Sequence, residues 1–188
     1  MPVKLSAFAD EIGDDPHLQI KTLQAVNVRY VELRGAWGVN VLKLSSPQVA
    51  ELKRLFTANG IAVSCIASPI GKVRLDEDWD SHFDHFKHAV DLAETFGSGY
   101  VRIFSFYAPQ GGRIEDHLDE VVRRLRQQAQ YVAARPVTLA LENESHIYGD
   151  TPERCATLMQ SLAGTKVTLA FDPANFVSID VLPVYERC

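Results

Sequence analysis

The chain has 188 residues, of which 46% are hydrophobic and 23% are charged. This composition is typical of a globular protein and provides enough chain for one substantial core. The net charge of −5 and the scattered Lys and Arg residues exclude the basic footprint of a nucleic-acid or anionic-membrane binder. We therefore expect neither nucleic acid nor membrane among the partners.

The N-terminal residues MPVKLSAFADEIGDD contain acids where a secretory signal needs an apolar core. No apolar run approaches the roughly 18 residues that cross a bilayer, so we expect a soluble, cytoplasmic protein. Cys65, Cys155 and Cys188 are far apart and form no CxxC motif. This pattern favours small buried hydrophobic residues over a disulfide framework or a cysteine zinc site.

Short apolar runs rich in β-branched residues recur about every 30 residues along the chain. They predict six strands, at Lys4 to Ala9, Arg29 to Leu33, Ile61 to Ala67, Tyr100 to Phe104, Val137 to Leu141 and Lys166 to Phe171. Stretches of helical period separate these runs, as in Ser46 to Asn59.

The ends of the expected helices carry typical capping and terminating residues. Ser46-Pro47 and Thr151-Pro152 predict an N-cap followed by proline in the first helical turn, whereas Asn59-Gly60 and Phe96-Gly97 predict helix ends. Regular alternation of strands and helices predicts parallel strands joined by right-handed crossovers. The fold class is therefore α/β.

An open doubly wound sheet and a closed (β/α) barrel both fit this alternation. The positions of polar residues relative to the strands distinguish the two folds. Polar groups follow nearly every predicted strand, as a barrel requires when it builds its site from many loops. No GxGxxG follows the first strand and no GxxxxGK[ST] occurs. We therefore predict a TIM-type barrel. About eight units in roughly 250 residues complete such a barrel, so we expect residues 1–188 to form a single barrel domain truncated to about six βα units.

Acids follow two consecutive apolar strands. Glu142 comes directly after Leu139-Ala140-Leu141, and Asp172 directly after Leu169-Ala170-Phe171. A carboxylate at a buried strand end is costly unless a cation or metal pairs with it. Because neighbouring parallel strands lie about 4.8 Å apart, both groups can share one hard divalent ion. The alternative is that the acids turn toward solvent.

The ordered motifs resemble the sugar phosphate isomerase/epimerase family of the xylose isomerase-like barrel superfamily. They are SAFADE at 6–11, VELRG at 31–35, ASPIGK at 67–72, VRIFSF at 101–106, LEN at 141–143 and FDPAN at 171–175. The resemblance implies a divalent metal (Mn²⁺, Mg²⁺, Co²⁺ or Zn²⁺) held by a Glu after strand five and an Asp after strand six. Glu142 and Asp172 match these ligands. A His and a second Glu from strands seven and eight, the other ligands of the family, have no counterpart.

The resemblance implies proton transfer through a metal-stabilised enediolate of a keto-sugar or sugar phosphate, with Glu142 as ligand and possible base. Six residues are candidates for substrate binding. Glu32 could orient hydroxyls, or instead pair with Arg34 or Arg102. Trp37 could form an aromatic wall, or simply pack in its loop. The remaining candidates are Lys72 and Arg102 for an anionic group, with structural salt bridges as the alternative, His146 from a loop, and Asn175, where some relatives have histidine.

Three histidines recur at intervals of three residues, at His82, His85 and His88, so they do not all point to one side of a helix. Charged residues lie among them, which favours a solvated face over a metal site. Two other functions stay open. One is a catalytically incomplete barrel that binds a ligand or self-associates, since a possible homo-oligomer would cover the open edge. The other is an endonuclease IV-like enzyme acting on abasic-site DNA, which the acidic charge disfavours.

Overall fold

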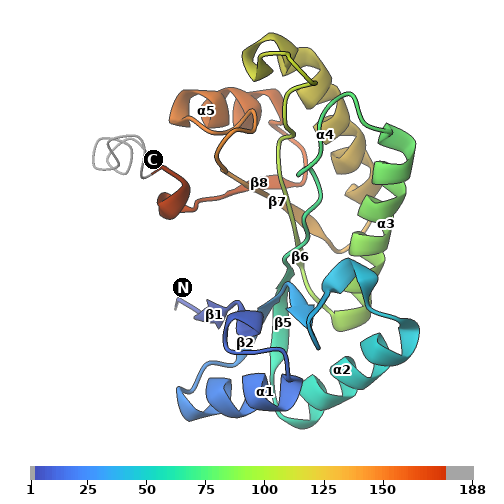
Figure 1. Cartoon of the computed structure of the whole chain (residues 1–188), viewed down its shortest axis with the longest axis vertical. Helices are drawn as coiled ribbons and strands as arrows, with labels where there is room; N and C mark the ends of the chain where they lie inside the picture. The colour runs from blue at the N-terminus through green and yellow to red at the C-terminus, as the bar shows by residue number, and fades with distance from the viewer. Residues whose placement is uncertain (1–2, 177–188) are drawn as a thin grey trace. The chain divides into compact units, whose positions relative to one another are not determined.

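A computed structural model describes residues 3–176 (Figure 1). Six strands form one sheet in the order β1-β2-β5-β6-β7-β8, and the pairs β1–β2, β2–β5, β5–β6 and β7–β8 are parallel. The strands are β1 (Ser6–Ala7), β2 (Tyr30–Leu33), β5 (Ala62–Ile66), β6 (Tyr100–Ile103), β7 (Thr138–Glu142) and β8 (Val167–Ala170). Each lies inside or within one residue of a predicted run, so the α/β class with a parallel sheet is confirmed.

The described residues divide into two compact units. One comprises residues 3–68 and 87–101, and the other comprises residues 69–86 and 102–176. The first is called unit 1 and the second unit 2. The helix α3 (Trp79–Phe96) contributes residues to both. The predicted tail from Val177 to Cys188 lies outside the described residues.

Unit 1 packs helices α1 (Pro16–Ala25) and α2 (Ser46–Ala58) side by side (Figure 1). The predicted apolar stripe of α2 is confirmed, because Leu52, Leu55 and Phe56 are buried. Burying a side chain of this size contributes about 2 kcal/mol. The predicted N-cap is wrong by one residue: Ser45 caps the helix through a capping box with Gln48. That arrangement satisfies amide groups that the first helical turn leaves unpaired.

A short hairpin follows β2 that the sequence patterns did not indicate. It pairs β3 (Gly35–Ala36) with β4 (Val39–Asn40), and a 3-10 helix, η2 (Val41–Lys43), comes next. Trp37 and Gly38 form the turn with φ of 55° and 69°. Positive φ at both central residues is the requirement of a type I′ hairpin turn. Trp37 thus lies in a tight turn and not in an open loop.

Unit 2 contains α4 (Leu118–Val132), α5 (Pro152–Ser161) and the first residues of α3. Thr151 caps α5 as predicted, accepting a hydrogen bond from the Arg154 amide. The core includes Phe104, Phe106, Leu125 and Leu139, each fully buried. The remaining short elements are 3-10 helices: η1 (Ala9–Glu11), η3 (Ile114–His117) and η4 (Pro173–Phe176).

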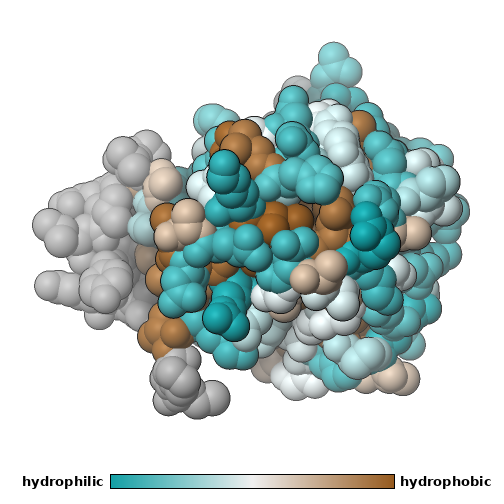
Figure 2. Space-filling model, turned by 90° about the horizontal axis from the view of Figure 1, so that it is seen from below, coloured by the Kyte–Doolittle hydropathy of each residue, from teal (hydrophilic) through white to brown (hydrophobic). Residues whose placement is uncertain are grey.

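The surface is mainly polar on the face drawn in Figure 2, where hydrophilic residues surround small groups of apolar ones. Among residues 3–176, no helix is both long and apolar enough to cross a bilayer. The expected solvated face of α3 is correct for His85 and His88 and wrong for His82, which is 8% exposed.

Candidate functional site

The carboxyl ends of β6, β7 and β8 bring three predicted site residues into unit 2. Arg102 lies on β6, Glu142 is the last residue of β7, and Asp172 follows β8. Because β7 and β8 are parallel and adjacent, the two acids lie at the same end of the sheet, where the carboxyl ends of the strands meet. Arg102 donates to Glu142 over 3.2 Å between Nη1 and Oε2, and both side chains are nearly buried.

Burial is the main influence on Glu142 and raises the pKa of its carboxyl. The positive charge of Arg102 opposes this rise, whereas the negative charge of Asp172 adds to it. The net pKa lies above the ordinary value of 4.5. A carboxylate held in this way accepts a proton or a cation more readily than one in water.

The end of β8 is tied to that of β7 by the side chain of Asn143. Its Nδ2 donates to the Asp172 carbonyl oxygen at 2.8 Å, and its Oδ1 accepts from the Asp172 amide at 2.7 Å. Asn175 donates to both the Asn143 carbonyl oxygen and the Asp172 carboxylate, each at 3.0 Å. The Asn175 amide, predicted to touch substrate, therefore holds the Asp172 carboxylate in this structure.

Replacing Asn143 by leucine should destabilise the protein by about 3 kcal/mol. The side chain is 1% exposed, and its loss leaves the amide and carbonyl groups of Asp172 without these partners. Asn143→Asp keeps the acceptor but places a buried negative charge against the Asp172 carbonyl oxygen, so it should cost at least as much. Urea unfolding of the three proteins tests this order, and a leucine variant as stable as the wild type would contradict it.

A second ion pair lies beside Glu142. Lys72 Nζ contacts Glu144 Oε2 at 2.6 Å and lies 4.4 Å from the centre of the Phe104 ring. The Arg102 guanidinium lies 5.0 Å from the same ring centre. Burial raises the pKa of Glu144. The hydrogen bonds from Lys72 and Ser145 lower it by more than burial raises it, so the net pKa falls below its ordinary value. The salt bridges considered for Lys72 and Arg102 are thus present.

The sequence patterns did not single out Asn143 or Glu144 as parts of the site, although both lie in the polar run that follows β7. Their partners come from distant segments, which spacing within one loop cannot indicate. His146, a predicted substrate contact, is exposed and has a φ of 66°.

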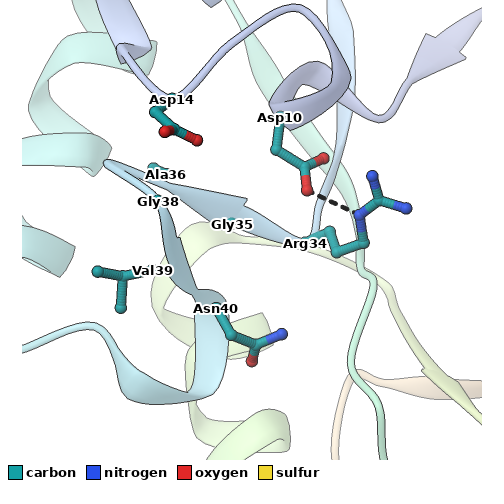
Figure 3. Close-up of a pocket in the computed structure, with 8 residues that line it drawn as sticks. All are labelled: Asp10, Asp14, Arg34, Gly35, Ala36, Gly38, Val39 and Asn40. Atoms are coloured by element: carbon teal, nitrogen blue, oxygen red, sulfur yellow. Dashed lines mark hydrogen bonds and ion pairs between the residues drawn. The ribbon is translucent and has the colours of Figure 1, made fainter.

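Unit 1 carries a separate pocket of about 300 Å³ (Figure 3). Asp10, Asp14 and Arg34 line it together with the β3–β4 hairpin. Arg34 Nε donates to Asp10 Oδ2 at 2.7 Å, and its Nη2 lies 3.1 Å from Glu11 Oε1. The hydrogen bond that Arg34 donates to Asp10 is the main cause that raises the pKa of Arg34.

The other two predicted substrate contacts also belong to unit 1. Glu32 lies half-buried on β2 in register with Cys65, and Trp37 lies half-buried in the hairpin turn. The Trp37 amide donates to the Asp14 carbonyl oxygen at 2.6 Å. This bond and the positive φ fix the backbone of Trp37.

The donor set suits part of a divalent-metal site. Glu142 and Asp172 supply carboxylate oxygens, which hard cations prefer, and a cation would relieve the repulsion between them. Within residues 3–176, no group of three or more His, Cys, Asp or Glu side chains is arranged to hold a metal ion. The described residues thus offer at most these two carboxylates to such an ion.

A family model described as "Xylose isomerase-like TIM barrel" matches residues 20–184. The chain belongs to this family, and its fold is the xylose isomerase-like TIM barrel fold. Comparison with curated proteins finds no match.

Solved structures of low sequence identity share the fold. A xylose isomerase-like TIM barrel protein from Mycobacterium smegmatis in complex with magnesium is 17% identical, with a TM-score of 0.72 over 93% of this chain and 65% of that one. The probable 3-DHS dehydratase AsbF from Bacillus anthracis is 13% identical, with a TM-score of 0.76 over 98% and 69%. The 3-keto-D-glucoside 4-epimerase YcjR from E. coli is 11% identical, with a TM-score of 0.73 over 97% and 73%. This chain thus spans 65% of the length of the first.

Proposed function

We propose that this protein takes part in divalent-metal-dependent isomerisation or epimerisation of a keto-sugar or sugar phosphate. The observation that carries the proposal is Glu142, a nearly buried carboxyl of raised pKa between Arg102 and the charge of Asp172. Family membership and an epimerase of the same fold support it. The fold alone does not specify a reaction, so the proposed chemistry depends on these residues.

Glu142 and Asp172 would hold the metal in this proposal. When bound, the metal would supply positive charge that polarises the substrate carbonyl and acidifies the adjacent C–H bond. Glu142 would take that proton through an oxygen of its carboxylate, as a general base. Arg102 and Lys72 would balance the negative charge left on the substrate or hold a phosphate group.

The remaining predicted contacts complete the proposal. Glu32 would orient substrate hydroxyls, and Trp37 would offer an aromatic face. His146 would approach from the loop that follows β7, and Asn175 from η4 after β8.

A second candidate function is ligand binding without turnover. The two-carboxylate donor set of residues 3–176 favours it, because fewer protein ligands bind a hard cation more weakly. Binding would then be detectable although no substrate proton is exchanged.

One experiment separates these functions. The full chain is incubated with Mn²⁺ and keto-sugars or their phosphates in D₂O, and ¹H NMR follows the substrate α-proton. We expect its exchange with solvent, and loss of exchange with Glu142→Gln. The control Glu153→Gln changes an exposed acid of α5 in the same unit and should leave exchange unaltered. Sugar binding without exchange at saturating Mn²⁺ would instead favour the binding module.

A further inference from the structure

We propose that His82 is a positioning residue, whose ring nitrogen holds the Gly71 amide and thereby fixes Lys72 beside Glu144. This inference rests on the proposed function only where it assigns Lys72 to anion binding. The contacts all lie within unit 2.

His82 accepts a buried hydrogen bond from the turn that follows β5. The Gly71 amide donates to Nε2 over 3.0 Å. Since Nε2 is the acceptor, the proton of the neutral ring lies on Nδ1. A side chain of α3 thus holds a backbone group one residue before Lys72.

The other side of this turn is tied to the chain beyond β6. The Gly71 carbonyl oxygen accepts from the Phe106 amide at 3.1 Å, and the Ile70 carbonyl oxygen accepts from the Phe104 amide at 2.8 Å. Gly71 has a φ of 92°, and a Cβ there would lie 2.1 Å from the Phe104 carbonyl oxygen. The turn is therefore held from both sides, with His82 on one of them.

Aromatic rings fix the orientation of the imidazole. The Trp79 and Phe106 rings lie 6.1 and 6.2 Å from it, centre to centre. Burial is the largest cause that lowers the pKa of His82, to about 4. The charges of His85 and Arg124 lower it further, and Glu77 opposes them. The acceptor is thus neutral and available at pH 7.

The position of Lys72 depends on this turn because the amide of Lys72 closes it, donating to the Pro69 carbonyl oxygen at 3.0 Å. From there the side chain reaches Glu144 and the Phe104 ring. Without the acceptor at His82, the Gly71 amide is buried and loses this partner, a state that costs free energy. Rotation of the turn would relieve that cost and would displace Lys72.

The test uses NMR of the full chain. In the wild type, a coupling through the hydrogen bond should join the Gly71 nitrogen to His82 Nε2. The ring current of Phe104 should shift the Lys72 methylene protons next to Nζ. His82→Leu should return these protons to the shift of a solvated lysine, and His82→Gln, which keeps an acceptor, should restore the shift in part. The control His85→Gln changes an exposed neighbour on the same helix and should have no effect.

If His82→Leu does not fold, the wild type still provides a test. Lowering the pH through about 4 should abolish the Gly71 coupling as Nε2 takes a proton. An absent coupling at pH 7, or an unchanged Lys72 shift in a folded His82→Leu variant, would overturn the proposal.

Inorganic phosphate then probes the assigned use of Lys72. Lys72→Met and His82→Leu should each weaken its binding by about tenfold, as expected when one charge-assisted hydrogen bond is lost. Normal phosphate binding by Lys72→Met would reject anion binding by Lys72. The NMR experiment would still test the positioning role of His82, so a failure of anion binding by Lys72 can be told apart from a failure of that role.

Discussion

Gly71→Ala should destabilise the protein by about 3 kcal/mol or more. The new Cβ would lie 2.1 Å from the Phe104 carbonyl oxygen and 2.6 Å from its carbon, and both are backbone atoms that cannot rotate away. A φ of 92° adds strain for any residue with a side chain. Relief requires the 69–72 turn to separate from Phe104, which would break the hydrogen bonds that join them. Urea unfolding of the variant measures the loss.

Gly164→Ala is the matched control in the same unit. Gly164 has a φ of 79°, but nothing lies within 4 Å of its added Cβ. Only the conformational cost remains, about 1 kcal/mol. Equal losses in the two variants would show that the approach of Phe104 adds nothing at Gly71.

Much of the fold follows from the sequence because its signals are local. The apolar run at 61–67 is short, rich in β-branched residues and bounded by Gly60, and it forms β5. The stripe of α2 repeats with helical period and is buried as predicted. The polar run after the fifth predicted strand places Glu142 at the carboxyl end of β7, whereas its ion pair with Arg102 was not predicted.

The features that the sequence could not supply depend on contacts between distant segments. His82 has the charged neighbours of a surface residue, yet a turn eleven positions earlier and the Phe106 ring bury it. Glu144 lies 72 positions from Lys72 along the chain, so no spacing rule joins them. The β3–β4 hairpin escapes prediction because Trp37 occupies a turn position where Asn or Gly is usual.

Glu142→Gln should abolish most activity and yet stabilise the fold at neutral pH. We expect exchange of the substrate proton to fall by about 10³-fold, because an amide cannot accept the proton. Burial and the Asp172 charge raise the pKa of Glu142 in spite of Arg102. The Glu142 carboxyl therefore binds a proton more tightly in the folded protein than in the unfolded chain. Its protonation stabilises the folded state, and this contribution is complete only below the ordinary pKa of 4.5. It is lost as the pH rises through the folded pKa, so removing the charge should gain roughly 0.5–1 kcal/mol at pH 7.

Glu144→Gln should show the opposite sign and is the control for this argument. Burial raises the pKa of Glu144, but Lys72 and Ser145 together lower it by more. The net pKa is therefore below the ordinary value, so the ionised form stabilises the folded state. That contribution is present above the ordinary pKa and is lost as the pH falls through the folded value. The variant should therefore be about 1 kcal/mol less stable at pH 7 and close to the wild type in strong acid. Urea unfolding from pH 3 to pH 8 compares the three proteins. If both substitutions destabilise equally at pH 7, then Glu142 is a structural ion-pair partner like Glu144, because its ionisation would not oppose folding.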